Sequence, residues 1–428
     1  MSRIAAMIGF SVLTAFASAT PPPDDFYVDV RGYLPQGYVI DGSVDYKPHI
    51  QKCFDENPHV IFPGSDDPTK PMVYGVTGAK EDGILKTRPK ARIRFGPNAV
   101  LKRLPSFGDL FELGHGTHLT GAVIDGNKYA HWPLVRDRPV KPYAFVIGHA
   151  VTLRGGNVIR DCFVYNNAGI AIGGWYASDN RIYRSRVENC GFLEALREPV
   201  WAGEHASADG FFFYRESHYN IVKDSEAIDC ARWGFVVEGG SAYNTFVDCR
   251  GGDVHVRTFG FIDVESAGPG NSLVRCRSPN SDLSVQSYFQ DAVGCTARKI
   301  WAEHASYPRF LGCTSVGGWF RFGEVREDRF VTPGRESPML GHNRFLLGGV
   351  SSDHSLTVIC ADGRGLATNN VLYGSADGDR RSTEMLLFGV GSRSGNIQSG
   401  DGGKEPIGQF ARPYYLRART DDGFKRSE

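Results

Sequence analysis

The sequence predicts an all-β solenoid, and three observations point to it. A six-residue motif recurs between Asn157 and Gln290: Asn, any residue, two mostly apolar residues, a charged residue, then Cys or Ser. Four of its copies are followed by an apolar strand that begins with glycine. The spacings between successive asparagines are 23, 40, 24 and 27 residues. Short-strand units that recur at this period bury their apolar faces only by stacking on one another.

The copies of the motif begin at Asn157, Asn180, Asn220, Asn244 and Asn271. The glycine-led strands begin at Gly169, Gly210, Gly234 and Gly260. The spacing of 40 is consistent with an ordinary coil that carries an insertion of about 16 residues. We therefore expect one regular stack of coils with a single large interruption in this region.

Composition agrees with many short strands and excludes some partners. Of the 428 residues, 52 are glycine and 41% are hydrophobic, while long helical apolar patterns are scarce. Lys plus Arg equals Asp plus Glu, at 48 each. A chain without net charge has no overall field to attract nucleic acid or an anionic membrane, so we expect neither as a partner.

The first 19 residues have the features of a signal peptide. Arg3 supplies the positive charge, the segment from Ile4 to Phe16 is mostly apolar, and Ala17-Ser18-Ala19 fits the small-residue cleavage pattern. The apolar segment is too short to span a bilayer comfortably, and no later stretch is long and apolar enough to do so. We expect cleavage after Ala19 and a secreted or periplasmic protein.

A short helix is expected to precede the first regular coils. Ile50, Phe54 and Tyr46 lie on one face of it, and Ser43 is placed to cap it. The sequence HVIFPGS then predicts a strand that ends in a turn. Residues 91–127 predict two or three early coils, and residues 128–142 predict a basic loop that contains proline.

The region from Asp29 to Phe388 resembles the pectate lyase-like superfamily. The resemblance rests on the opening GYVIDGSVDY through HVIFPGS, and on the strand THLTGAVIDGN that ends at Asn127. It implies a right-handed, single-stranded parallel β-helix with a short N-terminal capping helix. It also implies that the recurrent asparagines sit at turns, form a ladder and tolerate left-handed dihedral angles.

The resemblance and the repeats divide the chain into four parts. Residues 1–19 are the signal peptide, and residues 20–90 are the lead and cap of the solenoid. Residues 91–392 form the parallel β-helix. Residues 393–428 form a C-terminal loop and tail.

The nine cysteines fall largely at equivalent repeat positions. Stacked coils bring equivalent positions to about 4.8 Å, which is within the range that a disulfide allows. Equivalent side chains point in parallel, however, rather than toward each other. We therefore favour stacks of buried thiols over disulfide bridges, although export would permit bridges.

Candidate site residues cluster around the largest insertion, Phe192–Ala208, because loops of a solenoid grow where its ligand lies. Strand alternation places Phe211 and Phe213 inside and makes Tyr214 a neighbour of Glu238 on the next coil. The expected catalytic residues are Tyr214, Arg215, His205, Asp209, Glu238 and Lys223. The expected substrate-binding residues are Trp201, Arg232, Trp233 and Trp175. Aromatic rings beside charges of both signs suit sugars.

Three activities fit these residues. A uronate lyase neutralises a carboxylate with Arg, Lys or Ca²⁺ and removes the neighbouring proton with a base such as Tyr214. A glycoside hydrolase uses two carboxylates, for which Asp209 and Glu238 are the best pair. A non-catalytic β-helix that binds glycan, or forms part of a cell surface, is the third alternative. The lyase is slightly favoured.

The resemblance does not identify a subfamily. The paired aspartates of its polygalacturonase-type hydrolases, the Asp-Pro-His-Asp of its epimerases and the Ile-Asp-His of its classical pectate lyases are not found. No subfamily's catalytic residues therefore carry over, and a metal site is not assigned. Calcium as a cofactor stays open, and so does a homotrimer, since some β-helix enzymes are trimers.

Overall fold

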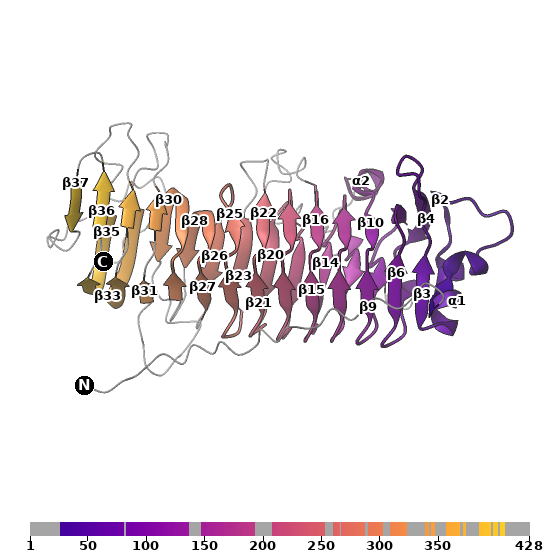
Figure 1. Ribbon diagram of the computed structural model, residues 1–428, viewed down its shortest axis with the longest axis horizontal. Coiled ribbons are helices and arrows are strands. Elements are labelled where there is room, and N and C mark those ends of the chain that lie inside the picture. Colours follow the sequence, from indigo (N-terminus) through magenta and orange to yellow (C-terminus); the bar gives the residue numbers. More distant parts are fainter. Residues whose placement is uncertain are drawn as a thin grey trace.

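The computed structural model shows a single-stranded parallel β-helix, with strands stacked coil upon coil along one axis (Figure 1). Its description covers residues 26–80, 83–136, 147–192, 208–252, 260–265, 267–286, 290–302, 309–322, 339–341, 344–346, 357–368, 371–373, 385–394, 397–400 and 403–406. The strands form three ladders, which we call faces A, B and C. The chain passes them in that order in each regular coil. The predicted all-β parallel β-helix is confirmed.

Within the described residues, face A is one ladder of 14 strands. They are β1 (Val28–Asp29), β3 (His59–Phe62), β6 (Arg92–Phe95), β9 (His118–Thr120), β12 (Val158–Arg160), β15 (Arg181–Tyr183), β18 (Ile221–Lys223), β21 (Thr245–Val247), β24 (Ser272–Val274), β27 (Asp291–Val293), β29 (Arg309–Leu311), β31 (Met339–Gly341), β33 (Thr357–Thr368) and β35 (Met385–Ser394).

Face B follows face A after a two-residue turn in the regular coils. Its strands are β2 (Asp41–Asp45), β4 (Met72–Thr77), β7 (Ala99–Leu104), β10 (Val123–Asp125), β13 (Phe163–Tyr165), β16 (Arg186–Glu188), β19 (Glu226–Ile228), β22 (Arg250–Gly252), β25 (Arg277–Ser278), β28 (Thr296–Ala302), β30 (Thr314–Phe322), β32 (Arg344–Leu346), β34 (Val371–Tyr373) and β36 (Ile397–Gly400). The final strand, β37 (Gly403–Pro406), pairs with β36 in the antiparallel direction.

Face C carries the strands that matter most for the site. They are β5 (Leu85–Lys86), β8 (Phe111–Glu112), β11 (Val151–Thr152), β14 (Ile172–Trp175), β17 (Phe211–Tyr214), β20 (Trp233–Glu238), β23 (Gly260–Glu265) and β26 (Leu283–Gln286). Face C joins face B where β26 pairs with the second half of β28.

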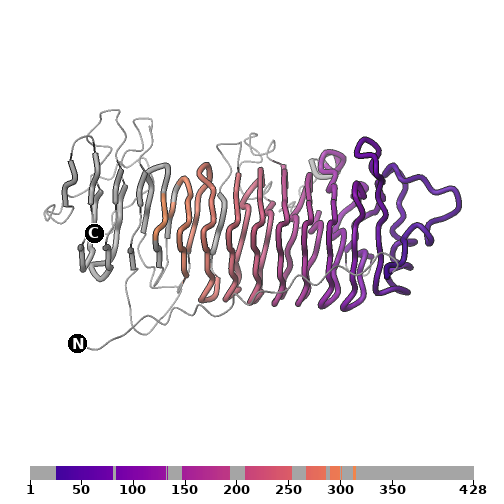
Figure 2. The backbone as a smooth tube through the Cα atoms, in the orientation of Figure 1, coloured from indigo at the N-terminus to yellow at the C-terminus, as the bar shows by residue number. Residues whose placement is uncertain are grey.

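The recurrent asparagines form a buried ladder at the turn from face C to face A. Asn180 donates from its backbone N–H and its side-chain amide to Oδ1 of Asn220, at 3.0 and 2.9 Å. Asn220 makes the same two bonds to Asn244. The left-handed residue of this turn is the one before each asparagine, for example Asp179 with φ 62°. The expected ladder is present, but the asparagines are not themselves the left-handed residues. The tube in Figure 2 shows the coils stacked one upon the next along the axis.

The motif's final Cys or Ser forms a second buried row, at the turn from face A to face B. Cys249, Cys276, Cys295 and Cys313 are buried free thiols at this position. Earlier in the row Ser185 accepts a hydrogen bond from the backbone N–H of Cys162 at 3.3 Å. Burial raises the pKa of the Cys162 thiol to about 12, so it stays protonated. The favoured thiol stacks agree with the structure, since all eight cysteines whose side chains it describes are free.

Helix α1 (Lys47–Glu56) covers the open end of the first coil. Its buried residues are Ile50, Cys53 and Phe54, and the Phe54 ring stacks on Phe111 with centroids 5.7 Å apart. The predicted capping helix is confirmed. The Ser43 cap is wrong, because Ser43 lies within β2 and the helix begins at Lys47, whose N–H donates to Asp45 at 3.0 Å.

Residues 128–136 form helix α2 (Lys128–Arg136) rather than the expected loop. The helix lies in the connection from face B to face C, at the upper edge of the molecule in Figure 1. Lys128 is fully buried, and its ammonium donates to Asn189 Oδ1 and to the carbonyl of Gly191 two coils later. Those two bonds fix the start of the helix to the solenoid.

The ladders run across the boundaries expected from the sequence. Strands β2 to β5 precede residue 91 and already pair with strands of the later coils. Strands β36 and β37 lie beyond residue 392. The expected signal peptide and most of the C-terminal tail lie outside the described residues.

Candidate functional site

The outward side of face C carries most of the side chains expected at the site. Phe213 pairs with Val237, which places Tyr214 beside Glu238 on the next coil. Phe211 and Phe213 are buried in the main core. The alternation expected from the sequence is therefore correct for β17 and β20, and the two strands present Tyr214 and Glu238 on one surface.

A small apolar cluster forms the floor of this surface. Its members are Ile170, Phe212, Trp233 and Val236, with Tyr214 packed against them. The ring of Tyr214 stacks on Phe212, with centroids 5.5 Å apart. Trp233 is only 7% exposed. Its ring thus supports the floor and leaves little open surface for a sugar.

Arg215 lies over two aromatic rings at the end of face C. Its guanidinium carbon is 5.1 Å from the centre of the Trp175 ring and 5.6 Å from that of Tyr214. Trp175 is 38% exposed. No carboxylate among the described residues lies within ion-pair distance of Arg215. Cation–π contacts position its charge without neutralising it, so the group is suited to bind an anion.

Arg232 joins the two candidate carboxylates. It donates to both oxygens of Asp209, at 2.9 Å from Nε and 2.7 Å from Nη2. The same Nη2 lies 3.1 Å from Oε1 of Glu238. The Asp209 side chain is 4% exposed and that of Glu238 is 15% exposed. Asp209 also accepts from the Trp233 N–H. Asp209 is therefore held as a buried acceptor, and Glu238 is the more accessible carboxylate.

The structure does not bring Lys223 to this group. It lies on face A, where it pairs with Tyr183 and Val247 of the neighbouring coils. Its ammonium is 3.9 Å from Asp224. His205 and Trp201 lie outside the described residues. Their insertion connects β16 on face B to β17 on face C.

A second polar group lies at the start of face C and was not found from the sequence. Asp109 Oδ1 is 3.1 Å from His149 Nδ1 and accepts from the His149 backbone N–H at 2.8 Å. Thr152 donates to Oδ2 at 2.8 Å. Burial opposes the charge on Asp109, but the bonds from His149 and Thr152 outweigh it and hold its pKa below the usual range. The pair is an ionised carboxylate that orients an imidazole.

The other ring nitrogen of His149 has no partner. His149 is 6% exposed, and its Nε2 makes no hydrogen bond in the described structure. Arg103, fully buried, donates to the carbonyl of His149 at 2.8 Å and to that of Ile147 at 2.6 Å. An imidazole held at Nδ1 by a carboxylate can exchange a proton at Nε2. No repeat spacing relates Asp109 to His149, which explains why the pair was missed.

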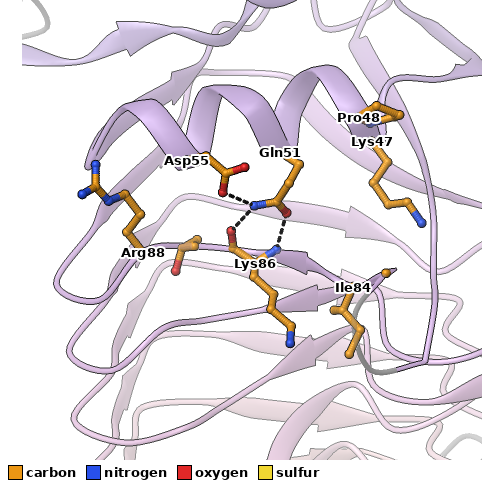
Figure 3. Close-up of a pocket in the computed structure, with 9 residues that line it drawn as sticks. Lys47, Pro48, Gln51, Asp55, Ile84, Lys86 and Arg88 are labelled. Carbon is orange, nitrogen blue, oxygen red and sulfur yellow. Dashed lines mark hydrogen bonds between the residues drawn. The ribbon is translucent and has the colours of Figure 1, made fainter.

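Charged side chains continue along face C to its N-terminal end. Glu112 bonds to Arg154 at 2.7 Å and lies 3.8 Å from the Lys86 ammonium. Beyond Lys86 a pocket opens between α1 and β5 (Figure 3). Gln51 of α1 joins the two walls through bonds to the backbone of Lys86, and its amide also donates to Asp55 on the same helix. The lining residues also include Lys47 and Arg88. The surface suited to a ligand thus extends over several coils.

No calcium site is assigned among the described residues. Ca²⁺ takes six to eight oxygen ligands, and within the described ranges no three His, Cys, Asp or Glu side chains converge. No step is therefore assigned to calcium. Within those ranges, no helix is long and apolar enough to cross a membrane.

Comparisons with known proteins agree with this architecture. Residues 115–275 match the family described as the right handed beta helix region. The family 28 exopolygalacturonase of Yersinia enterocolitica is 10% identical, with a TM-score of 0.52 over 86% of this chain and 78% of that one. The GH87 alpha-1,3-glucanase catalytic unit of Streptomyces thermodiastaticus strain HF3-3 is 11% identical, with a TM-score of 0.50 over 93% and 73%.

A third similar structure is longer than this chain. The chain covers 59% of ORF18 of Geobacillus virus E2, using 74% of its own length, at 11% identity and a TM-score of 0.42. No curated protein is significantly similar in sequence. At these identities the comparisons establish the fold, a right-handed parallel β-helix, as the sequence predicted.

Proposed function

We propose that the protein is an exported enzyme that cleaves an acidic glycan on face C by β-elimination. The observation that carries the proposal is Arg215, an exposed guanidinium held over Trp175 and Tyr214 with no carboxylate partner among the described residues. A uronate residue would supply the carboxylate for this guanidinium, and its sugar ring can stack on an aromatic face.

The reaction needs one cation and one proton-transfer group. Arg215 binds the carboxylate of the uronate and stabilises the negative charge that develops on it as the neighbouring C5–H bond breaks. The Tyr214 oxygen, as phenolate, takes that proton. The C5 electron pair forms the double bond to C4, and the C4–O bond to the next sugar breaks. The proton held by Tyr214 then passes to the departing oxygen.

An assay with a panel of uronate polymers tests the proposal. Elimination creates an unsaturated product that absorbs ultraviolet light, so absorbance should rise on at least one polymer. Tyr214→Phe should reduce turnover at least 100-fold, as loss of a proton-transfer group does, while far-ultraviolet circular dichroism stays unchanged. Full activity in both Tyr214→Phe and Glu238→Gln would show that the site is placed wrongly.

Hydrolysis is the second candidate, and the position of Glu238 favours it. Glu238 and Asp209 contact the same nitrogen of Arg232, so two carboxylates lie close together as a retaining glycosidase requires. Two of the similar structures are by name a glucanase and an exopolygalacturonase. New reducing ends without ultraviolet absorbance would favour this candidate, and Glu238→Gln should then abolish them. If neither ultraviolet absorbance nor new reducing ends appear but glycan binding is measurable, the protein would be a binding protein.

Export is part of the proposal, because a polysaccharide substrate lies outside the cell. The N-terminal sequence supports it through Arg3, the apolar segment that follows and Ala17-Ser18-Ala19. We expect the protein recovered from the medium or periplasm to begin at Thr20. N-terminal sequencing decides this, and an intact Met1 on the exported protein would contradict it.

A further inference from the structure

Two exposed tyrosines lie side by side on the turn from face C to face A. Tyr219 is 55% exposed and Tyr243 is 49% exposed. Their rings are nearly parallel, with centroids 5.2 Å apart and planes 5° apart. Each directly precedes an asparagine of the buried ladder, so both occupy the same position in successive coils. Neither belongs to the cluster under Tyr214 or to the acid pair at Asp209.

Both tyrosines adopt a backbone conformation that suits them poorly. Their φ angles are 59° and 57°, in the left-handed region. The same position is Gly156, Asp179 and Gly270 in other coils, and Gly and Asp accept this conformation at lower cost than a bulky aromatic residue. The turn itself therefore does not require tyrosine. Strain that the fold does not need is a reason to look for a function.

One ring face of the pair is open. The Tyr243 ring packs closely against Gly270, because a Cβ built on that glycine would be 2.5 Å from Tyr243 Cδ1. Tyr219 covers the other side of Tyr243. The remaining face of Tyr219 points toward the coil of Asp179, which occupies the equivalent turn position and is exposed. The pair thus forms a platform that is one ring wide.

Polar residues of both kinds neighbour the pair: Asp179 holds the equivalent turn position of the preceding coil, and His218 directly precedes Tyr219. The Asp179 carboxylate is a hydrogen-bond acceptor. His218 Nδ1 accepts from the backbone N–H of Ala242 at 3.0 Å, which leaves the hydrogen of the neutral ring on Nε2 as a donor. The His218 and Tyr219 rings are 6.2 Å apart. An aromatic face beside an acceptor and a donor matches a sugar, which has an apolar C–H face and a rim of hydroxyl groups.

We propose that Tyr219 and Tyr243, with Asp179 and His218, form a surface site that binds a sugar residue of a polysaccharide chain. The large apolar side chains exposed on this edge of the described structure are all aromatic: Trp175, Tyr176, Tyr219 and Tyr243. The site holds the polymer and takes no part in bond cleavage, so it does not depend on the proposed lyase activity.

Replacement of the two tyrosines by asparagine tests the site. Asn accepts the left-handed conformation, so Tyr219→Asn/Tyr243→Asn should fold with an unchanged or higher melting temperature. We expect affinity electrophoresis through gels that contain polygalacturonate or α-1,3-glucan to retard the wild-type chain in at least one gel. The double variant should bind that polymer at least tenfold more weakly. The matched control is Lys90→Asn, the exposed left-handed residue of the same turn in an earlier coil. Relative to its own migration in a gel without polymer, it should be retarded as strongly as the wild type.

The other outcomes are equally decisive. Equal retardation of the double variant and the wild type, or no retardation of the wild type in either gel, would overturn the proposal. So would a wild-type dimer or trimer that the double variant dissociates on size exclusion, because the tyrosines would then form a contact between copies. Turnover of short soluble oligosaccharides should be the same in both proteins. Retardation that depends on the tyrosines, in a chain without any activity, would support this site and reject the lyase.

Discussion

The buried asparagines stabilise the solenoid through hydrogen bonds that run from coil to coil. Asn220 accepts from the backbone and the side chain of Asn180, and its own amide donates to Asn244 and to the carbonyl of Ala177. None of these groups reaches water. The loss of one side chain therefore leaves several buried donors and acceptors unpaired.

Asn220→Ala should lower the free energy of unfolding by about 3 kcal/mol, because each unpaired buried group costs roughly 1 to 3 kcal/mol. Urea unfolding followed by circular dichroism measures the change. Lys223→Ala, on the outward side of the adjacent strand, is the control and should shift stability by less than about 0.5 kcal/mol. A similar shift in both variants would mean that the ladder is not a principal source of stability.

His131 should make the fold sensitive to mild acid. Its Nδ1 contacts the Asn127 carbonyl and its Nε2 accepts from the Ser106 N–H, so the folded ring is neutral. Burial and the charge of Arg103 lower the pKa of His131 to about 4. The unfolded ring, with a pKa of about 6.5, binds a proton more readily, so stability falls as the pH drops from about 6.5 to 4, by about 3 kcal/mol.

His131→Gln should remove that part of the pH dependence. The measurement is the free energy of unfolding at pH 7 and pH 4.5 in both proteins. The decrease in the free energy of unfolding at still lower pH should remain in the variant. They belong to groups such as Asp109, whose lowered pKa stabilises the fold until the carboxylate is protonated. The same drop in both proteins between pH 7 and 4.5 would contradict the assignment to His131.

At the residue scale, the sequence predicted what depends on strand alternation and little of what depends on contacts between coils. The prediction that Tyr214 lies beside Glu238 follows from the alternation of side chains along a strand and from the repeat that aligns the two coils. The observed register of β17 and β20 agrees with it. The bridge from Arg232 to Asp209 and Glu238 depends on how one long side chain crosses the surface. The pairing of Asp109 with His149 joins residues that no repeat relates. Neither feature has a sequence signature.

The two helices show where pattern reasoning succeeds and fails for single elements. Helix α1 buries apolar residues at helical spacing, so its existence was predictable. Its start was not, because Ser43 is a residue type that commonly caps helices, whereas the residue at the cap is Tyr46, which makes no side-chain cap bond. Helix α2 buries Lys128 and His131 and contains Pro133. Buried polar residues and an internal proline are typical of a loop, so the sequence pointed away from a helix.

Helix α1 should be essential for stability as the cover of the first coil. Phe54→Ala removes a ring that packs on Phe62 and Phe111, and should cost about 3 to 5 kcal/mol. Thermal unfolding measures the effect. Lys52→Ala, on the exposed side of the same helix, and Ser43→Ala should both be close to neutral. A large loss in Ser43→Ala would restore that residue as the cap.

At the scale of the whole molecule, the stack of coils was readable from the sequence because each coil must repeat the same buried positions. The thiol row follows from the same rule. We expect the folded chain to resist thiol-labelling reagents at its buried cysteines and to react after denaturation. Reductant should leave the melting temperature unchanged. Stability that falls on reduction would indicate disulfide bridges and contradict the free thiols of the structure.

The function depends on irregular features that repeats do not encode. Face C acquires its chemistry from side chains that differ between coils: Trp175, Tyr214 and Arg215 at one end, and Asp209, Arg232 and Glu238 over the apolar floor. The sequence pointed to this region through the insertion before Asp209. It could not show that Arg232 pairs with two carboxylates while Arg215 pairs with none among the described residues. On that difference we propose Arg215 as the cation that binds the substrate.

The central claim is therefore that Arg215 recognises the carboxylate of an acidic glycan, and one comparison tests it most directly. The measurement is kcat/KM, or affinity if no turnover occurs, on a polyuronate and on its methyl ester. The wild type should prefer the free acid, and Arg215→Gln should lose that preference while Arg184→Gln, an exposed arginine on the turn from face A to face B, keeps it. An undiminished preference in Arg215→Gln, or no activity and no binding of the wild type on either polymer, would contradict the account.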